Sequence, residues 1–171
     1  MNASVGHAST PGLRSAERAP GQLVLVLNNT LAAIEAGRVE MLDFLGPDAL
    51  DARVVNRLEV VFEEVIANIV RHGFAPGADQ AIRVAVCATP DAVQLVFEDE
   101  GPAFDVTRAP DPPRPTSLET APLGGLGVPL IHRLARSLRY EAPEPGEASC
   151  QLGGRPFAPR NRLFVTIARA A

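Results

Sequence analysis

Lysine is absent from this chain of 171 residues, and all sixteen basic side chains are arginine. A nucleotide-binding P-loop needs a lysine on the phosphates, and the usual protein-kinase fold needs one on a strand beside them. Schiff-base catalysis needs a lysine amine. The missing lysine therefore excludes these three chemistries.

Cysteine and histidine are also scarce. The two cysteines, Cys87 and Cys150, lie far apart, and the three histidines show no spacing typical of a zinc site. No apolar run reaches the roughly 18–20 residues that a membrane-spanning helix needs. The N-terminus lacks the apolar segment of a secretory signal. These absences predict a cytoplasmic protein that contacts no membrane.

The charge balance and the composition narrow the remaining classes. The net charge is −4 and the isoelectric point about 5.4, which argues against binding to nucleic acid through bulk charge. Apolar residues make up 46% and charged residues 21% of the chain, so it can bury a core. We expect residues 1–20, which are small and polar, to form a disordered leader and residues 21–171 to form a single domain.

Hydrophobic periodicity divides the domain into helices and strands. Residues 51–71 repeat apolar side chains at helical spacing without glycine or proline, so they predict the strongest helix. The expected elements, in order, are a strand at 22–27, helices at 31–45 and 51–71, a hairpin of strands at 81–87 and 92–98, a loop at 102–123, a helix from 127 to about 137, a strand at 138–140, a Pro- and Gly-rich insert at 142–160 and a strand at 162–169. This order predicts an α+β sandwich with helices on one face of a sheet.

Three polar clusters interrupt the apolar elements, and the first lies on the long helix. Glu64, Asn68 and His72 follow one another at four-residue spacing, so they project along one side of the helix. A carboxylate and an amide one turn apart can order a water, hold a hydroxyl or supply oxygen to a metal ion. A solvated helix face explains the same pattern without any function, and His72 in particular suits packing or capping.

The other two clusters follow a strand and precede a helix. Asp99 ends an apolar run and Gly101 follows it, an arrangement that can accept a hydrogen bond from a ligand amine while another group comes close. An ordinary acidic turn has the same composition. Residues 124–127 (GGLG) open a helix, where exposed N–H groups and the helix dipole favour phosphate. Each cluster alone is weak evidence.

Together, the three clusters resemble a known superfamily. Glu-x-x-x-Asn on a helix, Asp-x-Gly-x-x-Phe-Asp after a hairpin and Gly-Gly-Leu-Gly before a helix resemble the N, G1 and G2 boxes of the GHKL ATPases. The segments EEVIANIVRHGF, FEDEGPAFD and GGLGVPLI look most similar to its anti-sigma-factor serine/threonine kinases. The resemblance covers residues 21–141 and 162–169. It implies the Bergerat fold, a two-layer α/β sandwich with helices on one face of a mixed, mostly antiparallel sheet.

The resemblance also implies ATP and Mg²⁺ as ligands and carries roles over to individual residues. Asn68 matches the residue that holds the nucleotide-bound Mg²⁺, and Glu64 matches the general base one turn before it. Asp99 matches the acceptor of the adenine amino group. The remaining matches are Gly101 beside the base, Gly125, Leu126 and Gly127 in the phosphate loop, Thr166 near adenine and residues 102–123 as the lid.

The function that this resemblance implies is that of a protein kinase in a bacterial regulatory switch. Such a kinase phosphorylates a serine or threonine of a small anti-anti-sigma (STAS-type) partner and can also sequester a sigma factor, and relatives often form homodimers. Two alternatives use the same boxes: a regulatory module that binds ATP without turnover, and the detached catalytic domain of a histidine kinase. The second is weaker because the sequence shows no dimerising helical hairpin with a phosphoacceptor histidine. An α+β domain that binds no nucleotide is the remaining alternative.

Overall fold

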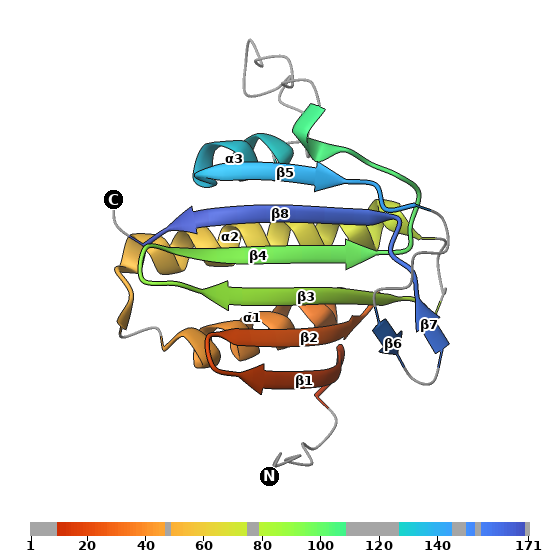
Figure 1. Ribbon diagram of the computed structural model, residues 1–171, viewed down its shortest axis with the longest axis horizontal. Coiled ribbons are helices and arrows are strands. Elements are labelled where there is room, and N and C mark those ends of the chain that lie inside the picture. Colours follow the sequence, from red (N-terminus) through yellow and green to blue (C-terminus); the bar gives the residue numbers. More distant parts are fainter. Residues whose placement is uncertain are drawn as a thin grey trace, which may run out of the picture.

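The computed structural model describes residues 10–46, 49–74, 79–108, 127–144, 150–152 and 155–169. Its two layers are a six-stranded sheet and three helices, which all lie on one face of the sheet (Figure 1). The helices are α1 (Ala32–Leu45), α2 (Ala52–Asn68) and α3 (Gly127–Leu134). The sheet contains β1 (Leu13–Ala19), β2 (Gln22–Asn28), β3 (Ala81–Ala88), β4 (Ala92–Asp99), β5 (Ser137–Glu141) and β8 (Asn161–Ala168), and a separate hairpin contains β6 (Cys150–Leu152) and β7 (Arg155–Phe157). The predicted two-layer α+β sandwich is confirmed.

The strands follow the order β1-β2-β3-β4-β8-β5 across the sheet. Every neighbouring pair is antiparallel, so the sheet that the resemblance implied to be mixed has no parallel pair among its described strands. β8 lies between β4 and β5, and its first residue pairs with the last residue of β4, so that Asn161 lies opposite Asp99. This register brings together two polar residues that are far apart in the sequence.

The hydrophobic core lies between the sheet and the helices. Leu23, Leu25 and Leu27 alternate along β2 and are completely buried, because alternate side chains of a strand point to the same face. α2 supplies the opposite wall with an apolar stripe that includes Phe62. α1 approaches this stripe closely at Gly37, where a Cβ atom would lie 2.5 Å from Phe62 Cζ. In the described part of the chain, no helix is long and apolar enough to cross a membrane.

Helix α2 begins and ends at features that position its polar residues. Asp51 caps the first turn, because its side chain accepts a hydrogen bond from Arg53 N at 2.8 Å. After Asn68 the backbone continues as a π-helical turn, Ile69–Gly73 (η2). Such π-turns often occur at functional sites. The helix predicted at 51–71 is therefore present, but its last turn differs from the regular α-helix that the four-residue spacing assumed.

Strand β1 was not predicted from the sequence. It pairs antiparallel with β2, so the prediction of a disordered leader at 1–20 is wrong for Leu13–Ala19, while residues 1–9 lie outside the described residues. β1 shows no apolar alternation because it is an edge strand whose side chains are mostly exposed. Pro20 and Gly21 form the turn to β2, and Gly21 adopts a φ of 72° that favours glycine. That Pro-Gly pair is the feature of the sequence that indicates a turn, and hence a strand before it.

The insert predicted at 142–160 contains the hairpin of β6 and β7. The two strands pair antiparallel near the end of the sheet where β4 finishes (Figure 1). Phe157 is buried against Val26 and Ala81, which point to the face of the sheet that carries no helices. The hairpin therefore covers part of this outer face, opposite the helices.

Candidate functional site

A cavity of about 490 Å³ opens between α2, η2, α3 and the adjoining ends of β4 and β8. Its apolar lining includes Val65, Ile69, Phe97, Val128, Ile131 and Leu163. Its polar lining includes Asn68, His72, Asp99, Tyr140 and Asn161. Cavities of roughly 300–1,000 Å³ with apolar walls and a few polar groups are typical of sites for small ligands.

Asp99 is the acidic side chain among the described residues that line this cavity. The residue is only 5% exposed, and no cation in the described part of the chain forms an ion pair with it. Its Oδ1 accepts hydrogen bonds from Gly101 N at 2.8 Å and from Asn161 Nδ2 at 2.9 Å. Burial raises the pKa of Asp99 above its ordinary value, and these two hydrogen bonds offset only part of the rise. A carboxylate held in this way is suited to accept a further hydrogen bond from a ligand.

Gly101 lies where two backbone segments touch. A Cβ atom at this position would lie 2.4 Å from Gly73 O and 2.8 Å from Asp99 Oδ1, so a larger residue requires the chain to move. Gly73 is the last residue of η2. The glycine that was predicted beside the ligand is therefore the point at which the end of η2 and the segment after β4 close one side of the cavity.

Asn161 connects the parts of the site, and it was not predicted from the sequence. Its partners are Asp99 (2.9 Å), Gly101 O (3.2 Å) and Pro102 O (3.1 Å) through Nδ2, and Phe104 N (3.0 Å) and Tyr140 Oη (2.7 Å) through Oδ1. The residue is 7% exposed. One side chain thus holds the end of β4, the segment that follows it and the middle of β5. The only feature of the sequence that pointed to Asn161 was its place as a polar residue just before a strand of alternating apolar residues.

Thr166 does not reach this cavity. It pairs with Gln94 and with Ser137, at the opposite end of β8 from Asn161. Its neighbours along the strand, Val165 and Ile167, are completely buried against the helices, so Thr166 points to the outer face. The expectation that Thr166 lies near the base does not fit the structure, and Asn161 holds the position beside Asp99.

Glu64, Asn68 and Gly127 are brought together where α2 meets α3. A Cβ atom on Gly127 would lie 2.3 Å from Glu64 Oε2 and 3.5 Å from Asn68 Nδ2. Asn68 Nδ2 is buried and has no hydrogen-bond partner among the described residues. An unpaired buried amide is costly, so this group is suited to gain a partner when a ligand binds. Of the predicted phosphate loop, only Gly127 can be placed, because Gly125 and Leu126 lie outside the described residues.

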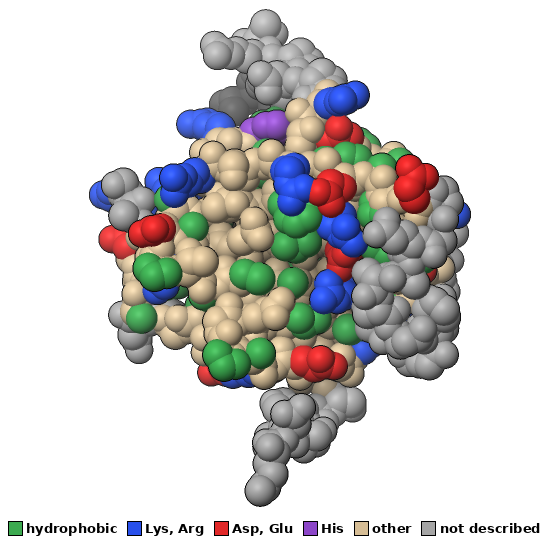
Figure 2. Space-filling model, viewed as in Figure 1, with side chains coloured by type: hydrophobic (Ala, Val, Ile, Leu, Met, Phe, Trp, Pro, Cys, Tyr) green, Lys and Arg blue, Asp and Glu red, His purple; other side chains and the backbone are tan. Residues whose placement is uncertain are grey.

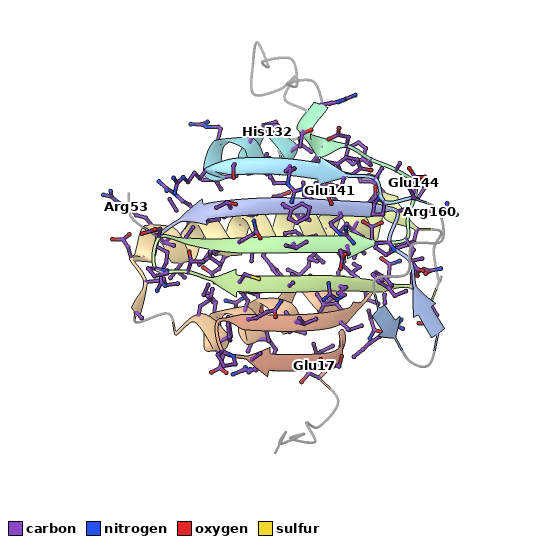
Figure 3. All side chains as sticks on the ribbon, viewed as in Figure 1. Glu17, Arg53, His132, Glu141, Glu144 and Arg160 are labelled. Carbon is purple, nitrogen blue, oxygen red and sulfur yellow. The ribbon has the colours of Figure 1, made fainter. Side chains whose placement is uncertain are left out.

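The first part of the predicted lid at 102–123 is held at two points. Phe104 N donates to Asn161 Oδ1. The ring of His132 on α3, which is labelled in Figure 3, forms a hydrogen bond with Val106 O at 2.9 Å. Val106 begins a short 3₁₀ turn, Val106–Arg108 (η3), and its side chain lines the cavity. Residues 109–123 lie outside the described residues. The described part of this segment therefore forms a fixed wall of the cavity.

The arrangement provides three chemical functions around one space. A largely apolar cavity with one carboxylate among its described lining residues can take a flat, amino-bearing ring. The N-terminus of α3 is suited to bind phosphate. The amide oxygen of Asn68 is suited to bind a cation. Glu64 supplies a half-buried carboxylate without an ion-pair partner in the described part of the chain, so it can accept a proton. The roles that the resemblance implies for Glu64, Asn68 and Asp99 stay predictions.

Comparisons with known proteins agree with the fold. The profile of the family described as histidine kinase-like ATPase domain matches residues 27–151. The chain is 36% identical over 94 residues to the serine/threonine-protein kinase BtrW of Bordetella bronchiseptica, a match that covers 55% of this chain and 66% of the relative. The chain thus spans just under two thirds of that relative's length. Because the profile matches well over half of the chain, this protein belongs to the family of histidine kinase-like ATPase domains.

Proposed function

We propose that the domain binds ATP together with Mg²⁺ in the cavity and transfers the γ-phosphoryl group to a serine or threonine of a small anti-anti-sigma (STAS-type) protein. The observation that carries this proposal is the meeting of Glu64, Asn68 and Gly127 beside the cavity that Asp99 lines. Family membership supports ATP binding, and the similarity to a protein named a serine/threonine-protein kinase supports the transfer. The partner is inferred from the resemblance of the sequence boxes alone.

The base and the phosphates of ATP would use different parts of the site. The apolar walls around Phe97 and Ile131 suit the adenine ring, and the Asp99 carboxylate accepts a hydrogen bond from its amino group. The phosphates lie toward the start of α3, where the helix dipole and free N–H groups favour negative charge. Since the chain has no lysine, these groups and a metal ion must balance most of the phosphate charge.

The residues beside the phosphates fit a bound Mg²⁺. The described residues contain no group of three or more His, Cys, Asp or Glu side chains that could hold a metal. Asn68 instead offers one amide oxygen, which suits an ion that keeps phosphate oxygens and waters as its other ligands. Its buried, unpaired Nδ2 gains an acceptor if a phosphate oxygen lies beside it. When bound, the ion neutralises charge that develops on the phosphates.

Glu64 is the general base in this proposal. Its carboxylate lies one helical turn before Asn68 and faces the start of α3 at Gly127. As the hydroxyl oxygen of the partner bonds to the γ-phosphorus, the bond from that phosphorus to the β,γ-bridging oxygen breaks and ADP leaves, while the hydroxyl proton passes to Glu64. Phosphoryl transfer depends mainly on positioning and charge stabilisation, so the domain's contribution is to hold the two reactants in line.

The substitution Glu64→Gln tests the proposal, and Glu63→Gln is its matched control because Glu63 is the exposed neighbour on the same helix. Loss of a general base lowers the rate of phosphoryl transfer about 10²–10⁴-fold. We expect this loss for Glu64→Gln with little change in ATP affinity, and no loss for Glu63→Gln. Transfer from labelled ATP to the purified partner and calorimetric titration with ATP give the two measurements.

The outcomes separate the kinase from its alternatives. Equal transfer rates for both variants would show that Glu64 is not the base. ATP binding without transfer by the wild-type protein to any partner tested would indicate the regulatory module that binds ATP without turnover. Absence of ATP binding in the wild type would refute the proposed function altogether.

A further inference from the structure

The two oxygens of the Asp99 carboxylate have different surroundings. Oδ1 accepts two hydrogen bonds, one from Gly101 N and one from Asn161 Nδ2. A carboxylate oxygen has two lone pairs, so both are occupied. Oδ2 accepts no hydrogen bond from any described residue, although Asp99 lines the cavity. The protein therefore presents a ligand with one free carboxylate oxygen instead of two.

The amide of Asn161 cannot rotate to change this arrangement. Its Oδ1 accepts from Phe104 N, which can only donate, and from the Tyr140 hydroxyl, which donates in this arrangement. Its Nδ2 faces only acceptors, which are Asp99 Oδ1 and the carbonyls of Gly101 and Pro102. A flipped amide would place an N–H group against the Phe104 N–H and an oxygen against three acceptors. The hydrogen bond from Asn161 to Asp99 is therefore fixed by its surroundings.

The number of free carboxylate oxygens matters for the choice of purine. The edge of adenine offers one exocyclic amino group, which needs one acceptor. Guanine offers two adjacent donors, N1–H and the 2-amino group, and has an acceptor, O6, where adenine has its amino group. Two adjacent donors match a carboxylate whose two oxygens are both free, as in a bidentate contact. When Oδ1 already accepts two hydrogen bonds, adenine can still make its one contact, to Oδ2. Guanine then makes one contact fewer than it would with a carboxylate whose two oxygens are both free.

We propose that Asn161 is a specificity-determining residue that selects adenine over guanine nucleotides by saturating Oδ1 of Asp99. This inference rests on the proposed function, because it assumes that a purine nucleotide binds in this cavity. It assigns to Asn161 a role beyond joining strands, and it makes Tyr140 a positioning residue that keeps the Asn161 amide in the required orientation.

The test compares Asn161→Ala with the wild-type protein and with Asn56→Ala, an exposed asparagine on α2. Each is titrated calorimetrically with ATP, GTP and inosine triphosphate in the presence of Mg²⁺. In Asn161→Ala, Oδ1 keeps only the Gly101 donor and can accept a second one from guanine. A hydrogen bond to a charged group corresponds to about a tenfold or larger change in affinity, so we expect the ratio of ATP to GTP affinity to fall about tenfold. Asn56→Ala should keep the wild-type ratio.

Inosine triphosphate identifies the contact that changes. It has the N1–H and O6 of guanine but lacks the 2-amino group, so it cannot use both carboxylate oxygens as guanine can. Its affinity for Asn161→Ala should therefore rise less than that of GTP. An equal rise for both nucleotides would overturn the proposed bidentate contact.

The result can be read even if Asn161→Ala folds poorly. Tyr140→Phe removes the hydroxyl that donates to Asn161 Oδ1 and retains the aromatic ring, so it should lower the ATP-to-GTP ratio in the same direction by a smaller factor. If Asn161→Ala folds and its ratio of ATP to GTP affinity is unchanged, the inference is overturned and the proposed binding of ATP is not. If only Tyr140→Phe folds, an unchanged ratio in that variant has the same meaning. Equal affinity of the wild type for ATP and GTP overturns the inference too. No binding of any nucleotide overturns both this inference and the proposed function.

Discussion

Glu98 and Asp99 are neighbours on β4 whose side chains point to opposite faces of the sheet. Their carboxylates differ in the kind of partner that surrounds them. Both are nearly buried, with 2% and 5% of their surface exposed. Glu98 lies on the outer face between Arg83 of β3 and Arg162 of β8, and it forms ion pairs with both. Asp99 lies on the helical face and meets only N–H donors.

The pairs around Glu98 continue across the sheet. Arg162 also contacts Glu141, and Glu141 contacts Arg139, whose guanidinium lies over the ring of Phe164. Figure 2 shows these arginine and carboxylate side chains alternating in a column on the outer face. Each charge in the column has an opposite charge beside it, so the column is complete without a ligand.

The difference indicates which buried carboxylate is part of a site. A buried charge is stable when it is paired, and a paired charge has little left to offer a ligand. Asp99 has no cation beside it in the described part of the chain and retains an oxygen without a hydrogen bond. Groups whose pKa is raised by burial in a cavity are candidates for function. Burial alone does not separate the two residues, but their partners do.

The largest effect that we expect is on ligand binding, from Asp99→Asn. The amide places an N–H₂ group where the adenine amino group needs an acceptor, so one hydrogen bond is lost and two donors face each other. ATP affinity should fall about 100-fold or more. Titration of this variant beside Glu98→Gln measures the contrast, because the Glu98 side chain points away from the cavity. An equal loss of affinity in both variants would contradict the assignment of the two faces.

The next effect is on stability, from Glu98→Gln. Loss of the carboxylate leaves Arg83 and Arg162 without their shared counter-charge, and breaking a buried pair in this way costs about 3–5 kcal/mol. The two arginines are about one fifth exposed, so water offsets part of the cost and we expect about 2–3 kcal/mol. Urea unfolding measures it. Glu141→Gln is the control at the exposed end of the column and should cost about 1 kcal/mol or less.

The smallest effect that we expect is on the pH dependence of stability, from Asp99→Asn. Burial raises the pKa of Asp99, so its contribution to the ligand-free fold is favourable below the unfolded pKa and is lost as the pH rises through the folded pKa. Asp99→Asn cannot ionise and should therefore melt at a higher temperature than the wild type at pH 7. This gain should shrink as the pH is lowered toward 3.8. Glu98→Gln should melt at a lower temperature than the wild type at pH 7. If Asp99→Asn also melts below the wild type at that pH, the ionised Asp99 does not destabilise the ligand-free fold.

Much of the fold could be predicted because its elements carry strong local patterns. The apolar stripe of α2 and the alternation along β3, β4 and β8 follow from burial on one face, which the sequence records directly. β1 lacks such a pattern because an edge strand is held by backbone hydrogen bonds and exposes its side chains. Only the Pro-Gly turn before β2 pointed to it.

The site was predictable where its residues are close in the sequence. Glu64 and Asn68 lie one helical turn apart, and Asp99 and Gly101 lie in one turn, so local spacing predicts their proximity. Asn161 reaches Asp99 only through the register between β4 and β8, and no local pattern specifies that register. For the same reason Thr166 was placed on the correct strand but at its wrong end and on its wrong face.

The position of β8 within the sheet has a consequence for the order in which the domain is synthesised and folded. β4 and β5 leave the ribosome before β8, yet β5 pairs with no strand except β8 among the described strands. β5 therefore has no strand partner until β8 is translated. The pairing of β4 with β8 joins segments far apart in the sequence, and such contacts form slowly. Asn161 arrives with β8, so the pocket around Asp99 is completed at the same moment as the sheet. Capture of a nascent chain by immobilised nucleotide would then report that the sheet has closed.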